Sequence, residues 1–445
     1  MAAPIGVPDT RHRNCLLPPA SPSVQAALVA RLLTGLSLGY FLVMLDTTIV
    51  TVALPALSPS LPAQQWISNG YTLTFAAFLL TAGAWSDRFG ARRVFSLGLI
   101  AFAALSGLSA LSFSTPMLIT LRALLGIAGA LLVPSSLSLI AAAYPASAAR
   151  AKAMGVWAAV SGTGLVAGPL LGGVLTEVFG WRAIFVVNVP VAAVAWALSR
   201  SAPASPARPG RIDVTGQLSA VVALSTLSYA LIERSWVALL LAVTAAAVFV
   251  RFQRVLPARL FRARAFPLGL AAGAIVNFGL SGVLFVLSLY FQETRGYPPS
   301  TTGLAFLPLT IPTAVNPIFT GRLVARFGPR IPAVSGFVLM SGGTLLQACT
   351  TAATLSVVAL ALLGFGVSLA IPSLLAMVVA AAPLELTGVA GGALNASRQA
   401  GAALGVAILG ALLTATTTSI ALFTAAGVLL AGAAALSREL FPVRL

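Results

Sequence analysis

A solitary acid in an apolar segment is the residue of this sequence best placed to do chemistry. Residues 32–57 are almost wholly apolar, and a segment of about 20 such residues can cross a lipid bilayer. Asp46 lies inside this segment, about 22 Å along a helix from the preceding charge, Arg31, and therefore beyond the middle of the membrane. Because an acid at that depth costs about 3 kcal/mol to insert, we expect Asp46 to face a cavity or a partner. Alternatively, Asp46 caps a broken helix or binds neighbouring backbone.

A cation in another apolar segment could act together with Asp46. Arg122 follows Pro116 closely, which places it about 9 Å below the start of its helix, at a depth similar to that of Asp46. Burial favours the neutral form of a carboxyl group, whereas a nearby guanidinium favours the carboxylate. A movement that separates the two would therefore change the proton affinity of Asp46. Alternatively, Arg122 is a static partner of Asp46 or of helix carbonyls.

A second buried cation lies in the carboxyl-terminal part of the chain. Arg398 could bind an anionic group of a ligand, pair with Asp46 across a cavity, or only bind carbonyls and extend toward the interface. Trp66, Asn69 and Tyr71 could line the outer part of such a cavity, although aromatic residues near the end of a span are commonly interface anchors.

The composition places these residues in a membrane protein. Hydrophobic residues make up 59% of the chain and charged residues 8%, and the mean hydropathy is +1.00. Basic residues number 26 against 9 acidic ones, but they fall in short loops, so the net charge of +17 does not indicate nucleic acid as a partner. Repeated apolar runs near 20 residues predict helices, because a β-barrel would show alternating strands of about ten residues.

Fourteen apolar segments are expected to span the membrane. Most basic residues fall in alternate loops, and only Arg182, Arg234 and Arg295 lie in the loops of the other side. The positive-inside rule therefore predicts a multi-pass protein of the plasma membrane with both termini in the cytoplasm. The expected spans are residues 32–57, 66–84, 94–112, 116–143, 154–176, 183–199, 214–232, 235–250, 266–292, 302–320, 332–350, 354–381, 387–415 and 417–436.

An internal repeat divides the chain. Residues 83–92 (GAWSDRFGAR) align without a gap with residues 321–330 (GRLVARFGPR), and each segment follows the second span of a six-span set. We therefore expect an all-α polytopic membrane fold with two six-helix bundles and two extra linker helices. The expected parts are a cytoplasmic tail at 1–31, bundles at 32–199 and 266–436, a linker with two spans at 200–265, and a second cytoplasmic tail at 437–445.

The first copy of the repeat carries a charged loop. Asp87 is expected at the end of a helix and Gly90 permits a tight turn, so the loop could dock against a neighbouring helix end as a latch between conformations. In the second copy Ala325 replaces the acid, so the latch would be one-sided. Otherwise the charges only mark the cytoplasmic side. The residues of this expected gating loop are Gly83, Asp87, Arg88, Gly90, Arg92 and Arg93.

Glycines spaced by four residues mark the fifth span. Gly164, Gly168 and Gly172 would share one face of a helix, beside Pro169 and Gly173. Small residues let two helices approach closely, and a proline permits a bend. Packing alone is sufficient to explain them.

These segments together resemble the major facilitator superfamily, and within it the fourteen-span drug:proton antiporters, over essentially the whole chain. Residues 45–55 (LDTTIVTVALP) resemble the first-span motif of that family, with Thr51 where Asn is usual. Residues 83–93 resemble the cytoplasmic loop motif of the superfamily. Residues 162–173 (GTGLVAGPLLGG) resemble the antiporter motif of the fifth span, and residues 180–190 (GWRAIFVVNVP) are similar to the sequence that follows it.

The resemblance implies roles for several of these residues. Arg122 matches an arginine assigned to proton transfer, and Leu125 replaces a Gln often found in the same motif. The 83–93 loop would gate the transporter, and the glycines of the fifth span would keep a helix interface tight against leakage. Two bundles that rock about a central site would give alternating access.

The expected function is a proton-coupled antiporter that exports small amphipathic or lipophilic compounds such as drugs and antibiotics. One charge moved through 100 mV is worth about 2.3 kcal/mol, so one carboxylate is sufficient. Without a second acid inside a span, monocationic, neutral or weakly anionic substrates are easier to accommodate than dications. The alternatives are a proton-coupled importer of a small solute and a non-transporting membrane sensor.

An enzyme is not expected from this inventory of residues. The single histidine is His12, no cysteine lies beside a base, and no two acids share the membrane for acid–base or metal chemistry. The distant Cys15 and Cys349 do not predict a disulfide. We expect no cofactor or metal, partners limited to a small-molecule substrate, protons and the bilayer, and a monomer.

Overall fold

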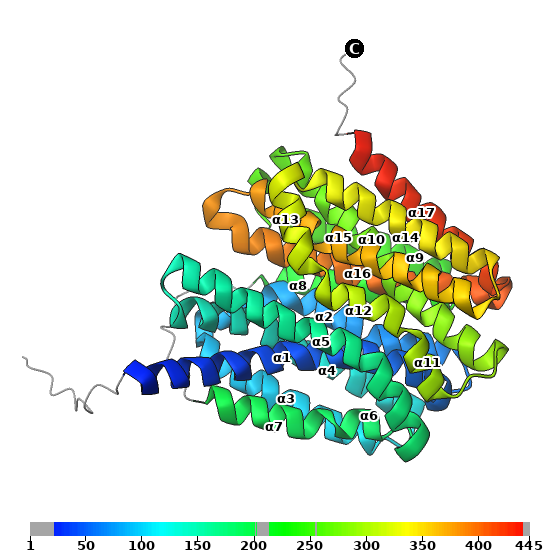
Figure 1. Cartoon of the computed structure of the whole chain (residues 1–445), viewed down its shortest axis with the longest axis horizontal. Helices are drawn as coiled ribbons and strands as arrows, with labels where there is room; N and C mark the ends of the chain where they lie inside the picture. The colour runs from blue at the N-terminus through cyan, green and yellow to red at the C-terminus, as the bar shows by residue number, and fades with distance from the viewer. Residues whose placement is uncertain (1–21, 201, 203–212, 254–255, 439–445) are drawn as a thin grey trace, which may run out of the picture.

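The computed structural model describes residues 22–200, 202, 213–253 and 256–438, and in this part of the chain helices are the regular structure and no strand is found (Figure 1). Ten of the described helices are long and apolar enough to cross a membrane. Helices satisfy every backbone N–H and C=O inside the segment, which lipid demands. The predicted class, an all-α multi-pass membrane protein, is confirmed.

The first bundle is formed by the helices that precede residue 200. α1 begins well before the expected span, and α6 and α7 are one apolar segment interrupted at Val187. α1 packs along α5 and α7, and α2 packs along α4. The helices are α1 (Pro22–Leu57), α2 (Leu61–Phe89), α3 (Ala91–Ala110), α4 (Thr115–Ala143), α5 (Ser147–Phe179), α6 (Ala183–Val186) and α7 (Asn188–Ser199).

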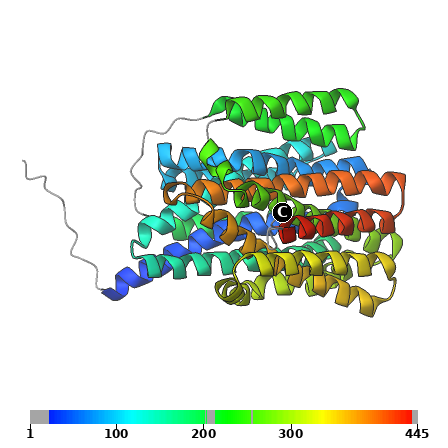
Figure 2. The ribbon, with the colours of Figure 1, turned by 90° about the horizontal axis from the view of Figure 1, so that it is seen from above.

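Two helices lie between the bundles in sequence, α8 (Val214–Ile232) and α9 (Trp236–Phe252). Asp213 and Ser235 cap their amino-terminal ends through side-chain oxygens that accept from backbone N–H groups. α8 packs against α2 of the first bundle and α16 of the second, and α9 packs on α8 (Figure 2). The insert therefore covers one side of the boundary between the bundles.

The second bundle is formed by the helices that follow residue 264. One expected span, 302–320, is divided into α11, α12 and α13. The breaks fall next to Pro308 and Pro317, which lack an N–H and clash with the preceding turn, whereas Pro312 lies inside α12. The elements are η1 (Ala258–Arg262), α10 (Ala265–Leu289), η2 (Tyr290–Thr294), α11 (Pro299–Ala305), α12 (Leu307–Val315), α13 (Pro317–Phe327), α14 (Arg330–Cys349), α15 (Ala353–Ala380), η3 (Leu384–Leu386), α16 (Thr387–Ala415) and α17 (Thr418–Arg438).

The internal repeat has the same backbone turn in both copies. Gly90 joins α2 to α3 with a φ of 89°, and Gly328 joins α13 to α14 with a φ of 74°. Both values lie in the left-handed region that only glycine adopts freely. The turn explains why the repeat keeps a glycine at this position.

A first seam between the bundles, the glycine seam, is formed by α5 and α11. A Cβ atom added at Gly173 would lie 2.3 Å from the carbonyl oxygen of Pro299, and one added at Gly303 would lie 2.3 Å from that of Pro169. Two backbones are therefore in direct contact, which only glycine at both positions permits. Ser300 N also donates to Glu177 Oε2 at 3.0 Å.

A second seam, the glutamine seam, is formed by α2 and α16. Gln65 is 1% exposed, and its Nε2 donates to the carbonyl oxygens of Val406 at 2.9 Å and Ala407 at 3.0 Å. A side-chain amide thus joins the bundles at this seam, whereas direct backbone contact joins them at the glycine seam.

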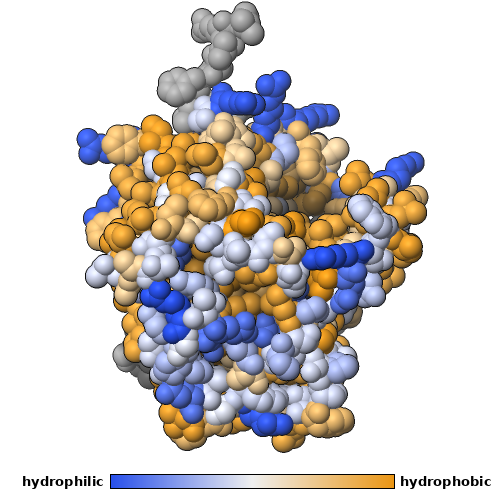
Figure 3. Space-filling model, turned by 90° about the vertical axis from the view of Figure 1, so that its right-hand side faces the viewer, coloured by the Kyte–Doolittle hydropathy of each residue, from blue (hydrophilic) through white to orange (hydrophobic). Residues whose placement is uncertain are grey.

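α10 and η2 of the second bundle also bind α1 of the first. Ser288 Oγ donates to the carbonyl oxygen of Thr51 at 2.8 Å, and Gln292 Nε2 donates to that of Val52 at 2.9 Å. These contacts and both seams lie toward the end of the molecule at which α1 ends and α2 begins. Figure 3 shows this end, where hydrophilic and near-neutral side chains lie across the middle of the face.

Each of the fourteen expected spans coincides with a helix or a run of short helices. Since ten helices meet the length and hydropathy of a span by themselves, the count of fourteen is compatible with the structure and stays a prediction. The domain boundaries also stay predictions. Cys349 is a free, exposed thiol, whereas Cys15 and most of both expected tails lie outside the described residues.

Candidate functional site

Asp46 and Arg122 form a buried ion pair between α1 and α4. Nη1 of Arg122 donates to Oδ2 of Asp46, and the two side chains are 2% and 0% exposed. Breaking such a pair would leave a charge buried without compensation, which is strongly unfavourable. The two residues that sequence alone singled out are therefore partners.

Asp46 has a second partner, which sequence reasoning passed over. Asn188, the first residue of α7, donates from Nδ2 to Asp46 Oδ1 and to Ser106 Oγ, each at 3.1 Å. Ser106 Oγ donates in turn to the carbonyl oxygen of Phe185 at 2.9 Å. The break between α6 and α7 places Asn188 here, and the one available signal was an amide residue in an otherwise apolar segment.

Arg122 is held by more than the carboxylate. Its Nε donates to the carbonyl oxygen of Ile67 at 3.2 Å, and its guanidinium lies 4.6 Å from the ring centroid of Tyr71. Tyr71 OH donates to the carbonyl oxygen of Val43 at 3.5 Å. All these groups belong to the first bundle, so a rigid movement of one bundle against the other would not by itself separate the pair.

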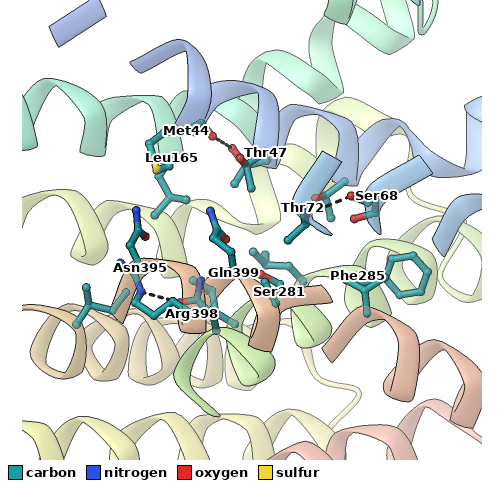
Figure 4. A pocket seen from close by; sticks show the side chains of 18 of the residues that line it. Met44, Thr47, Ser68, Thr72, Leu165, Ser281, Phe285, Asn395, Arg398 and Gln399 are labelled. Carbon is teal, nitrogen blue, oxygen red and sulfur yellow. Dashed lines mark hydrogen bonds between the residues drawn. The ribbon is translucent and has the colours of Figure 1, made fainter. Parts of the chain in front are cut away.

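A cavity of about 90 Å³ lies between the two bundles (Figure 4). α1 contributes Thr47 and Thr48, the residues that directly follow Asp46. Asp46 and Arg122 do not border this cavity. It is lined by Tyr40, Met44, Thr47, Thr48, Thr51, Ser68, Thr72, Leu165, Asn277, Leu280, Ser281, Leu284, Phe285, Ile371, Asn395, Arg398, Gln399, Ala402 and Val406.

Arg398 lies in the wall of this cavity, on α16. Its Nε donates to Oδ1 of Asn277 on α10 at 3.1 Å. The suggested pairing of Arg398 with Asp46 is absent from this structure, because Asp46 is already bound by Arg122 and Asn188. Arg398 and Asp46 are thus separate charged sites in different bundles.

The expected lining by Trp66, Asn69 and Tyr71 is wrong for this cavity, which Ser68 and Thr72 border instead. The rotation of α2 about its own axis explains which of its residues border the cavity. Tyr71 turns toward Arg122, and Trp66 Nε1 donates to Glu233 Oε1 of the insert at 3.3 Å. Asn69 is fully buried, and neither atom of its amide has a hydrogen-bond partner in the described part of the chain.

The glycines of α5 pack against α1 around Asp46. A Cβ atom at Gly164 would lie 2.7 Å from the carbonyl oxygen of Phe41, and one at Gly168 would lie 1.9 Å from Thr48 Oγ1. At Gly172 the nearest atom is the carbonyl oxygen of Ile49, at 2.4 Å. Gly173, next in sequence, belongs to the glycine seam, so one motif fixes α1 and also meets the second bundle.

The charged loop is exposed to solvent. Asp87, Arg88 and Arg93 are exposed, and Asp87 forms no ion pair with any residue that the structure describes. Arg92 Nη2 donates to the carbonyl oxygen of Arg200, directly after α7, at 2.5 Å. Gly83 lies inside α2 with Pro134 of α4 as its neighbour. The loop thus contacts a neighbouring helix end through an arginine, and the role of its acid stays a prediction.

Comparison with known families agrees with this architecture. A family model described as Major Facilitator Superfamily matches residues 36–406 and 269–444. The chain belongs to the Major Facilitator Superfamily. The family assignment that the sequence motifs suggested is therefore confirmed.

Curated members of the superfamily align over most of this chain. It is 36% identical to a methylenomycin A resistance protein of Bacillus subtilis (strain 168), over 85% of this chain and 86% of the relative. It is 37% identical to the methylenomycin A resistance protein of Streptomyces coelicolor, over 86% of each chain. The multidrug efflux pump LfrA of Mycolicibacterium smegmatis is 32% identical, over 86% of this chain and 80% of the pump.

Solved structures share the fold at lower sequence identity. A POT family transporter in complex with a thioalcohol-conjugated peptide superposes with a TM-score of 0.72 at 14% identity, covering 90% of this chain and 94% of that one. The xylose transporter XylE from E. coli superposes with a TM-score of 0.66 at 13% identity, covering 93% and 98%. These structures confirm the superfamily fold.

Proposed function

We propose that this superfamily member is a proton-coupled antiporter that exports small amphipathic or lipophilic compounds across the plasma membrane, with both termini in the cytoplasm. Relatives at 32–37% identity carry the names of antibiotic resistance proteins and of a multidrug efflux pump. The single observation that carries proton coupling is the buried pair of Asp46 and Arg122 beside the central cavity.

The proton site and the cavity are adjacent but distinct. Asp46 faces α4 and α7, whereas the next two residues, Thr47 and Thr48, face the cavity. A substrate therefore does not need to touch the carboxylate. Displacement of α1 would affect both sites at once, which makes α1 the element that couples them.

The second bundle can act on α1 through α10 and η2. Ser288 and Gln292 bind the carbonyl oxygens of Thr51 and Val52, about one to two turns of helix beyond Asp46. Opening the outer end would break these bonds and free α1 to move. If Asp46 then leaves Arg122 in the low-dielectric interior, the neutral acid is favoured and a proton is taken up.

The cavity volume fits a closed state of the cycle. About 90 Å³ is well below the roughly 300–1,000 Å³ of a site for a drug-sized ligand. Both seams and the α1–α10 contacts keep the bundles together at the predicted outer end. Admission of a substrate requires the bundles to part at the other end, toward the cytoplasm, where the loop of Asp87 and Arg92 would act as a latch.

The test is efflux of a panel of fluorescent lipophilic compounds from vesicles with an imposed pH gradient. Wild type is expected to show gradient-dependent efflux, whereas Asp46→Asn and Arg122→Ala should reduce it to the level of empty vesicles. Glu385→Gln, a carboxylate-to-amide change at an exposed residue, serves as the control and should behave as wild type. Equal, gradient-dependent efflux by all variants would remove Asp46 and Arg122 from coupling.

The direction of transport separates the proposal from its alternative. Accumulation of substrate in the compartment with the higher pH would contradict antiport and favour a proton-coupled importer. Absence of gradient-dependent movement for every compound would favour a non-transporting sensor.

A further inference from the structure

The wall of the central cavity carries one positive charge, Arg398, and no described residue of the wall carries a negative charge to balance it. The guanidinium of Arg398 has five N–H donors, and within the described part of the chain only the Nε–H has a partner, the amide oxygen of Asn277. The donors on the two terminal nitrogens therefore remain for a ligand. Figure 4 shows Arg398 beside Asn395 and Gln399 at the cavity wall.

No described residue that lines the cavity carries a carboxylate. The nearest buried acid, Asp46, is committed to Arg122 and Asn188, so this pair adds no net charge to the cavity when the carboxylate is ionised. Arg398 thus sets the sign of the charge that a ligand meets. Burying a second cation beside it would be costly, whereas an anion would form charge-assisted hydrogen bonds.

The rest of the lining has an amphipathic character. Asn277, Asn395 and Gln399 surround the guanidinium with amide groups, and hydroxyl groups come from α1 and α2. Leu280, Leu284 and other apolar side chains provide the remaining wall. A ligand with one acidic group and an apolar body would match both parts of this surface.

We infer that Arg398 binds the anionic group of amphipathic substrates that carry a single negative charge, such as a carboxylate. This inference rests on the proposed export function and names its substrate class. Export of a monoanion in exchange for a proton moves negative charge outward and positive charge inward, and an inside-negative potential drives both. Because Asp46 does not border the cavity, the anion and the proton would occupy separate sites.

The test is binding to the purified full-length chain in detergent, with two pairs of fluorescent probes that differ only in charge. The pairs are dansyl-leucine and its methyl ester, and 1-pyrenebutyric acid and its methyl ester. Wild type is expected to bind at least one acid about tenfold to a hundredfold more tightly than its ester, the range for a hydrogen bond to a charged group. Arg398→Lys should keep most of this preference.

Two variants remove the net charge in different ways. Arg398→Gln deletes the cation, and Asn277→Asp leaves it in place but supplies an internal carboxylate at its hydrogen-bond partner. Both should bind acid and ester about equally. Folding is checked by size-exclusion elution and thermal unfolding, and if one variant fails to fold the other decides the question.

The outcomes separate this inference from the proposed function. Equal binding of acid and ester by wild type in both pairs, or a preference retained in a folded Arg398→Gln or Asn277→Asp protein, would overturn the anion site. Gradient-driven efflux of neutral compounds by wild type tests the exporter by itself, so exporter function can hold while the anion site fails. If wild type prefers the acids but shows no gradient-driven efflux, the anion site stands and the proposed export function fails.

Discussion

Each bundle contains an arginine inside a span, buried in the first bundle and partly buried in the second, and the two differ in how completely the described residues satisfy them. Arg122 in the first bundle is buried and has a carboxylate, a backbone carbonyl and an aromatic ring as partners. Arg398 in the second bundle has one hydrogen-bond partner among the described residues, the amide oxygen of Asn277, and it borders the cavity. The first arrangement is a closed charge pair suited to a proton, and the second is an open cation suited to a ligand.

The two arginines lie in separate sites, one suited to a proton and one to a ligand, although the sequence alone allowed a single site for both. Asp46, Arg122 and Arg398 are three ionisable residues in apolar spans, and their pairing was open until the structure placed them. The structure assigns the acid to Arg122. Stability should therefore depend strongly on the first arginine and weakly on the second.

The largest expected difference in stability is between variants of Arg122 and of Arg398. Arg122→Ala should lower the free energy of unfolding by about 3–5 kcal/mol, because Asp46 would remain buried without a partner. Arg398→Ala should change it by only about 1 kcal/mol, because one hydrogen bond is lost. Unfolding of the purified proteins in one detergent measures both, and equal losses would refute the contrast. A double variant, Asp46→Leu with Arg122→Met, should recover most of the loss, since it removes both charges.

An intermediate difference is expected from adding one methyl group beside each site. In Gly168→Ala the new Cβ would lie 1.9 Å from Thr48 Oγ1 and 3.0 Å from the backbone nitrogen of Ile49. Displacement of α1 should cost about 1–3 kcal/mol. In Gly273→Ala the Cβ would meet only side-chain atoms, Leu394 Cδ1 at 2.5 Å and Arg398 Cγ at 3.2 Å, which can rotate away.

We therefore expect Gly273→Ala to lower the free energy of unfolding, measured in the same way, by less than Gly168→Ala does. Gly155→Ala is the control, since nothing lies within 4 Å of its added Cβ. If Gly168→Ala is as stable as Gly155→Ala, the close approach of α5 to α1 at Thr48 is not a determinant of the Asp46 site.

The smallest difference is expected for the two asparagines. Asn188→Ala removes the hydrogen bonds to Ser106 and to Asp46, which keeps Arg122, and should cost about 1–2 kcal/mol. Asn277→Ala leaves Arg398 in a cavity where water can replace the amide, and should cost less. Unfolding in detergent, combined with the efflux assay, would show Asn188→Ala to be the more harmful change; the reverse order would contradict the distinction between closed and open sites.

Much of the architecture could be predicted from local sequence. Apolar length predicts the helices, and the charged repeat containing Gly90 and Gly328 predicts two related bundles, because membrane depth and glycine geometry act on each segment separately. The lining of the cavity could not be predicted, since a shift of one residue along α2 exchanges Tyr71 for Thr72. Asn188 was missed for a similar reason, because its contact with Asp46 joins segments that are distant in sequence.

The sequence by itself determined that this chain resides in a membrane, that it contains two related bundles, and that a lone acid must find a partner there. These properties follow from the transfer of individual segments out of water, which depends on composition and spacing. Only the tertiary structure decided that Arg122 and Asn188 bind Asp46 while Arg398 stays open to the cavity. Those choices depend on the rotation and packing of separate helices, which the close contact of α1 with the glycines of α5 fixes.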